Sequence, residues 1–117
     1  MKGTFEKFTL ADNFDSDQQS PGLPYAIHPN GKTSERAHVL VAGGYDNSVY
    51  LLTPNGDASK FEYEKSIIEN TGGVVNGLDT YDIDGDGWLE MFVPNSTEGS
   101  IEIFKMSAPA SPTEFLQ

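Results

Sequence analysis

The sequence predicts an all-β fold. Short runs rich in valine, isoleucine, tyrosine and phenylalanine are separated by glycine, asparagine, aspartate and proline, which is the pattern of strands joined by turns. No long segment keeps a 3.6-residue apolar period without a helix breaker. At 117 residues the chain has room for one modest domain, or for two small repeat units that need neighbours to bury their faces.

Seven segments are expected to form strands, with turn-forming residues between them. The segment Phe61–Ile68 also allows a helical interpretation, because it contains Glu-Tyr-Glu-Lys. Residues 54–57, Pro-Asn-Gly-Asp, are a strong turn signal. Residues 43–47 and 94–99 are expected to join strand pairs as hairpins. The expected strands are Thr4–Leu10, His38–Ala42, Ser48–Thr53, Phe61–Ile68, Val74–Tyr81, Trp88–Val93 and Ser100–Lys105.

The chain contains two copies of one unit. A shift of 56 residues places residues 25–31 on residues 81–87, with tyrosine at the start and glycine at the end of both. Shifts of 51 to 52 residues bring residues 41–44 near residues 92–95 and residues 48–51 onto residues 100–103. A repeat of roughly 50 residues with about four strands is typical of a β-propeller blade. We therefore expect about two four-stranded blades.

The repeat suggests a division of the chain into four parts. We expect an outer strand closing a neighbouring blade (1–10), a blade with a degenerate metal loop (11–70), a blade with a metal loop (71–106) and a tail or linker (107–117). Pairing the N-terminal strand with the C-terminal blade would remove an exposed sheet edge. Two blades cannot close a ring, so they are either part of a larger propeller in a longer protein or completed by homo-oligomerisation of three or four copies.

Composition excludes several classes of partner. Eighteen acidic residues against seven basic ones give a formal charge of −11, which disfavours nucleic acid and anionic membranes and favours cations. Without cysteine there is no thiolate site, so a bound metal would be a hard cation held by oxygen atoms. No stretch approaches the roughly 20 apolar residues that span a bilayer, and membrane insertion is not expected.

The clearest chemical signal is the loop at residues 82–90, Asp-Ile-Asp-Gly-Asp-Gly-Trp-Leu-Glu. Its alternating carboxylates converge if the glycines let the loop bend, and their mutual repulsion requires a cation. Calcium takes six to eight oxygen ligands, whereas magnesium prefers fewer carboxylates and more water. An EF-hand or dockerin-type loop is not expected, because position 12 of an EF-hand loop would be Val93 instead of a bidentate glutamate. The predicted Ca²⁺ ligands are Asp82, Asp84, Asp86, the carbonyl of Trp88 and Glu90.

These residues, preceded by Gly-Leu-Asp at 77–79 and followed by Met-Phe-Val at 91–93, resemble the calcium loop of FG-GAP/VCBS repeats. Such repeats build the propeller of integrin α subunits and of many secreted lectins and carbohydrate-active proteins. The resemblance implies the ligand set above, with glutamate at position 90 where aspartate is more usual. It also implies that the ion staples the loop and has no catalytic role. In the first copy Ala26 and His28 replace two aspartates, so one ion per chain is expected.

The remaining residues offer little for catalysis. Neither His28 nor His38 has a nearby serine, cysteine or second histidine in the sequence, so we do not expect an enzyme. Three aromatic residues, Trp88, Tyr45 and Tyr50, are candidates for stacking on a sugar, with packing between blades as the alternative. Asn95 begins a glycosylation sequon that matters only in a secreted eukaryotic protein.

Together these features favour a calcium-stabilised binding module that recognises carbohydrate or a protein partner. An extracellular location, secreted or at the cell surface, is expected because free calcium is plentiful there. Two other hypotheses stay open. The chain could form the C-terminal blades of a larger secreted carbohydrate-active enzyme such as a polysaccharide lyase, or it could be a structural adhesin repeat.

Overall fold

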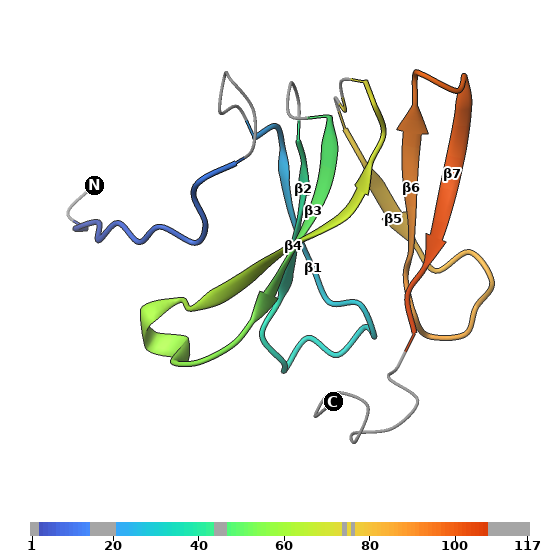
Figure 1. Cartoon of the computed structure of the whole chain (residues 1–117). Helices are drawn as coiled ribbons and strands as arrows, with labels where there is room; N and C mark the ends of the chain where they lie inside the picture. Colours follow the sequence, from blue (N-terminus) through green and yellow to red (C-terminus); the bar gives the residue numbers. More distant parts are fainter. Residues whose placement is uncertain (1–2, 15–20, 44–46, 74, 76, 108–117) are drawn as a thin grey trace, which may run out of the picture.

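The computed structural model of the chain describes residues 3–14, 21–43, 47–73, 75 and 77–107. Within these residues the chain forms two antiparallel sheets and no α-helix (Figure 1), which confirms the all-β prediction. The first sheet contains, in chain order, β1 (Pro24–Ile27), β2 (His38–Ala42), β3 (Ser48–Pro54) and β4 (Tyr63–Asn70). The second contains β5 (Asp79–Tyr81), β6 (Glu90–Asn95) and β7 (Ser100–Lys105), also in chain order.

Most expected strands form near their expected bounds. Strands β2 and β7 agree with the prediction, β3 is one residue longer, and β4 and β6 begin two residues later than expected. A single turn of 3₁₀ helix at Ala58–Lys60 precedes β4, because Asp57 caps it by accepting a hydrogen bond from the backbone of Ser59. Of the expected strand Val74–Tyr81, only β5 is formed, and Val74 lies outside the described residues.

The N-terminal half differs from the expected strand pattern in two places. Strand β1 is missed, because residues 25–31 look like a loop in the sequence and only pairing with β2 makes the first of them extended. The expected strand Thr4–Leu10 is not formed. A strand needs a hydrogen-bonded neighbour, and none of the described strands pairs with this segment. Its Phe8 ring instead lies 4.8 Å from the ring of Phe61, and Phe5 is 86% exposed.

The two sheets repeat one arrangement, and their register gives the true offsets. Adding 52 to the residue numbers of each β2–β3 pair gives a β6–β7 pair. Strand β1 corresponds to β5 with a larger offset, because 54 must be added to the β1 residue numbers to give the β5 residues paired with β6. The 56-residue alignment is therefore wrong by two residues. The corresponding pairs include Val39↔Leu52 with Met91↔Phe104, and Ile27↔His38 with Tyr81↔Glu90.

The hydrophobic core lies between the two sheets. Leu40 and Val49 of the first sheet pack in one cluster with Met91 and Val93 of the second, and all four are almost completely buried. The opposite face of the first sheet buries a second cluster, Val39, Val41, Tyr50 and Leu52, beneath residues 11–14. No helix among the described residues is long and apolar enough to cross a membrane.

Candidate metal centre

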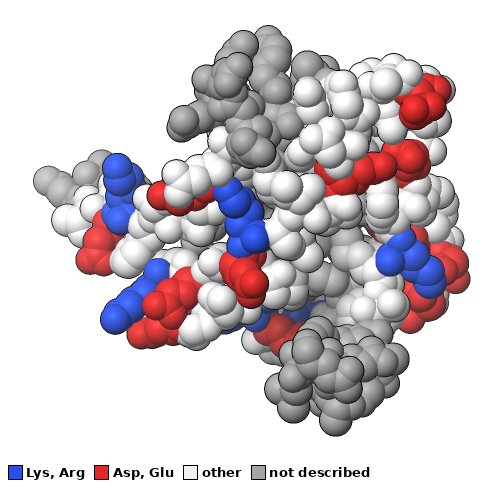
Figure 2. All heavy atoms as spheres, in the orientation of Figure 1, with Lys and Arg blue, Asp and Glu red and all other residues white. Residues whose placement is uncertain are grey.

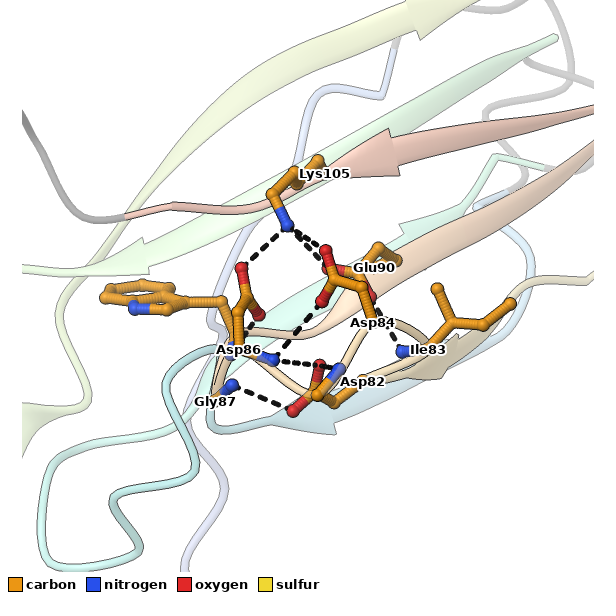
Figure 3. A network of polar contacts seen from close by, with 9 residues as sticks. Asp82, Ile83, Asp84, Asp86, Gly87, Glu90 and Lys105 are labelled. Atoms are coloured by element: carbon orange, nitrogen blue, oxygen red, sulfur yellow. Dashed lines mark hydrogen bonds and ion pairs between the residues drawn. The ribbon is translucent and has the colours of Figure 1, made fainter.

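The structure brings together the four acidic residues that the sequence singles out. Asp82, Asp84 and Asp86 lie on the loop between β5 and β6, and Glu90 is the first residue of β6. Each offers a carboxylate oxygen, and these oxygens all lie within 4.8 Å of one another. Figure 3 shows the side chains of Asp84, Asp86 and Glu90 pointing toward one place above the loop. This group can hold a metal ion.

The loop is shaped mainly by Asp82. Its Oδ1 accepts hydrogen bonds from the backbone N–H groups of Gly85 and Asp86, at 2.9 and 3.2 Å, and its Oδ2 accepts one from Gly87 at 2.8 Å. Gly85 and Gly87 have φ values of 76° and 89°, a backbone conformation that glycine adopts without steric cost. The hydrogen bonds to Asp82 and the positive φ angles of the glycines together make the backbone turn tightly at this cluster.

Asp84 and Asp86 each use one carboxylate oxygen to accept a backbone hydrogen bond within the loop, and the second oxygen of each faces the acidic cluster. Asp84 Oδ1 accepts a hydrogen bond from the backbone of Asp86 at 3.3 Å, and Asp86 Oδ1 accepts one from the backbone of Trp88 at 2.9 Å. Their Oδ2 atoms face the side chain of Lys105. The loop therefore holds both carboxylates in place for a cation.

Glu90 is the most constrained of the four carboxylates. The residue is only 2% exposed, and its Oε1 accepts a hydrogen bond from the backbone of Ile83 at 2.7 Å. Its Oε2 is buried and has no hydrogen-bond partner. A buried carboxylate oxygen without a partner is costly, and a coordinated cation would remove that cost. The residues present thus fit a metal ion bound by oxygen.

Lys105 is a member of the site that sequence reasoning missed. Its Nζ forms ion pairs with Asp84 Oδ2, with Asp86 Oδ2 at 2.6 Å and with Glu90 Oε2 at 3.6 Å. It is the last residue of β7 and pairs directly with Glu90 across the β6–β7 ladder. The sequence did not reveal this pairing: the expected turn at residues 94–99 would place position 103 opposite Glu90, whereas the strands pair from Asn95 and Ser100 and so bring Lys105 opposite Glu90.

The net charge of the site is strongly negative, even with Lys105 in place. Four carboxylates and one ammonium group leave a formal charge of −3 on the cluster. The hydrogen bond from Lys105 lowers the pKa of Asp86 to about 2, and Asp84 and Asp86 raise the pKa of Lys105. Figure 2 shows acidic side chains gathered round a basic one at the right-hand edge, over the β5–β6 loop.

The corresponding loop of the first sheet has the same backbone turn without the acidic groups. Moving its residues by the 54-residue offset of β1 places His28, Asn30 and Lys32 where the second loop has its three aspartates. Asn30 Oδ1 accepts a hydrogen bond from the backbone of Lys32 at 3.0 Å, as Asp84 does from Asp86. Gly31 has a φ of 74°, close to that of Gly85. Two of the three positions have thus lost a carboxylate in favour of a basic or titratable side chain.

A cavity of about 570 Å³ adjoins the loop between the two sheets. Trp88 and Lys105 line it beside His28 and His38, and burial lowers the pKa of His38. The Nδ1 atoms of both histidines are buried without a hydrogen-bond partner. The remaining walls are mostly apolar and come from both sheets, with Leu40, Leu51, Ile68, Met91, Phe104 and Met106 among them.

The three aromatic candidates for ligand contact have different positions. Trp88 lines the cavity, whereas Tyr45 lies outside the described residues. Tyr50 is 1% exposed, and its ring meets the ring of Phe14 edge to face at 4.9 Å. Tyr50 is therefore a core residue and has no free face to stack on a sugar. The carbonyl of Trp88 stays a predicted ligand, since the contact that the structure shows for Trp88 is made by its backbone N–H.

Comparison of the chain with family models, curated proteins and solved structures finds no match.

Proposed function

We propose that this chain is a calcium-stabilised binding module. The observation that carries the proposal is the convergence of Asp82, Asp84, Asp86 and Glu90 within 4.8 Å, with a buried oxygen of Glu90 left without a hydrogen bond. Carboxylate oxygens are the ligands of hard cations, and four of them in one site suit calcium better than magnesium. Zinc and copper are bound mainly by histidine or cysteine, and the cluster contains neither.

The role we propose for the ion is to hold the β5–β6 loop against the first sheet. The loop is tied to the β1–β2 loop of that sheet by a hydrogen bond of 2.8 Å from the backbone N–H of Leu89 to the carbonyl of Pro29. Calcium would neutralise the repulsion that otherwise opposes this loop conformation. Stabilisation of the loop then stabilises the contact between the two sheets.

Calcium is expected to raise the melting temperature of the chain by about 10 °C when it stands about 100-fold above its dissociation constant. Asp84→Ala should abolish this increase, because it removes a ligand on the exposed side of the site while the core stays intact. Thermal unfolding followed by circular dichroism, in calcium and in chelator, measures both effects. Glu64→Ala, an exposed acidic residue on β4, is the control and should keep the full increase. An equal calcium response in Asp84→Ala would contradict the proposed ligand set.

We further propose that the two sheets are adjacent blades of a β-propeller. The proposal is supported by their strand order, by the 52-residue repeat of their register and by the core that they share. The second sheet has three strands, and β7 pairs only with β6 among the described strands. Its outer face leaves Ile101 74% and Ile103 55% exposed. A fourth strand and a further blade would cover this edge and this face.

The missing strand can come from another copy of the chain, through its segment Thr4–Leu10. Studied alone, the 117-residue chain is then expected to sediment as a trimer or tetramer, giving rings of six or eight blades. Deletion of residues 1–10 should shift it to smaller species, whereas deletion of the tail 108–117 should not. Analytical ultracentrifugation makes the measurement. A folded monomer at all concentrations would leave only the alternative, in which the other blades belong to a longer protein.

The ligand of such a module is proposed to be carbohydrate or a protein, bound outside the cell. Calcium is plentiful there and can fill weak sites, and the acidic surface disfavours polyanionic partners. Trp88, at the cavity beside the metal loop, supplies an aromatic surface of the kind that packs on sugar rings. It is also the sole tryptophan of the sequence, so its fluorescence can report ligand binding directly.

A further inference from the structure

Lys105 places a positive charge in the position that a bound cation would take. Its ammonium group contacts carboxylates from three of the four acidic residues, and Figure 3 shows it directly above them. Among the described residues, all of the ion pairs to this cluster are made by Lys105. The buried Glu90 Oε2, which has no hydrogen bond, also faces it at 3.6 Å. Lys105 thus stands in for a metal ion.

We propose that Lys105 is a tethered competitor of calcium: its ammonium group neutralises the loop when the ion is absent, and calcium must displace it to bind. The inference rests on the proposed calcium site and specifies how that site is regulated. A lysine in this position keeps the empty loop folded and weakens calcium binding at the same time.

The ammonium group satisfies the cluster only in part. It carries one charge against four carboxylates and leaves a formal charge of −3. Its separation of 3.6 Å from Glu90 Oε2 is too long for a good hydrogen bond. Calcium carries two charges and accepts six to eight oxygens, so it can bind the oxygen of Glu90 that the ammonium leaves unsatisfied. The exchange of one cation for the other is therefore favourable at sufficient calcium.

The position of Lys105 on β7 permits this exchange. The ladder with β6 fixes its backbone, while its side chain is 50% exposed and can turn away into solvent. Lys105 also lines the cavity beside Trp88, so its departure would change the wall of that cavity. The exchange of the Lys105 ammonium group for calcium is therefore linked to the cavity beside Trp88, where ligand binding is proposed.

The test is a calcium titration of the full-length Lys105→Met variant. Methionine keeps most of the length of the side chain and removes the charge, so calcium affinity should rise about tenfold or more, as expected for the loss of several partly exposed ion pairs. Lys60→Met is the matched control, because it makes the same change of charge in the 3₁₀ turn at the far side of the molecule (Figure 1). Its affinity should stay within about twofold of the wild type.

A second readout follows the lysine itself. Amine-reactive labelling, read for each lysine by mass spectrometry, should show that calcium increases the labelling rate of Lys105 and leaves that of Lys60 unchanged. A Lys105 that stays as protected in calcium as in chelator would overturn the proposed displacement.

The possible titrations separate this inference from the proposed function. Tighter binding by Lys105→Met than by the wild type supports both. Equal affinities overturn the competition and leave the calcium site standing. If only Lys105→Met binds calcium and the wild type does not, competition is supported. Lysine would then have replaced the ion in the wild-type chain, and this result would contradict the proposed calcium-stabilised function. No binding by either protein overturns both proposals.

Discussion

Replacing Glu90 with glutamine is expected to weaken calcium binding on the order of 100-fold. The substitution removes one of four ligand charges and the one carboxylate that is held rigidly by burial. The amide oxygen of glutamine can still accept the hydrogen bond from Ile83 that Glu90 Oε1 now accepts. The loop should therefore keep its conformation, and the variant should melt in chelator at nearly the temperature of the wild type.

The comparison needs a control with the same change of charge outside the site. Glu98→Gln serves, because Glu98 is exposed in the turn between β6 and β7. Isothermal titration calorimetry gives the affinities of the two variants and the wild type. If Glu90→Gln bound calcium as tightly as Glu98→Gln does, Glu90 would not be a ligand, and its buried oxygen would need another explanation.

Leu40→Ala is expected to lower the free energy of unfolding by about 2 to 5 kcal/mol. Leu40 is 0% exposed at the centre of β2 and packs in the cluster that both sheets share. Truncation to alanine removes apolar contacts with the second sheet and enlarges the space between the sheets. Such a loss is a large part of the stability of a typical domain.

Urea denaturation in chelator measures this effect without a contribution from the ion. Ile67→Ala, on β4, is the control because Ile67 is 57% exposed, and it should change the free energy by about 0.5 kcal/mol or less. Equal effects of the two substitutions would contradict the packing of the two sheets against each other.

The strands that sequence reasoning predicted well are those in which the residues themselves favour a strand. His38–Ala42 and Ser48–Thr53 carry β-branched and aromatic side chains between turn signals, and both are formed. The strand β1 was missed because it has four residues, begins with proline and is extended only through pairing with β2. Thr4–Leu10 has the composition of a strand, but none of the strands in the described part of the chain pairs with it.

The candidate site was predictable where it depends on local spacing. Alternating aspartates between glycines bring three carboxylates close together in a tight loop, and Glu90 follows at the start of the next strand. The role of Lys105 depends on the register of a hairpin, and the burial of Glu90 depends on how two sheets pack. Neither property belongs to the loop itself, so neither could be obtained from its pattern alone.

Calcium binding by the intact wild-type chain, measured by isothermal titration calorimetry after removal of metal ions, is the most direct test of the proposed function. We expect one calcium ion per chain, a dissociation constant of about 10⁻⁴ to 10⁻³ M as in extracellular calcium modules, and weaker binding of magnesium. Absence of binding heat at calcium concentrations well above about 10⁻³ M, together with an unchanged melting temperature, would contradict the assignment of the loop as a calcium site.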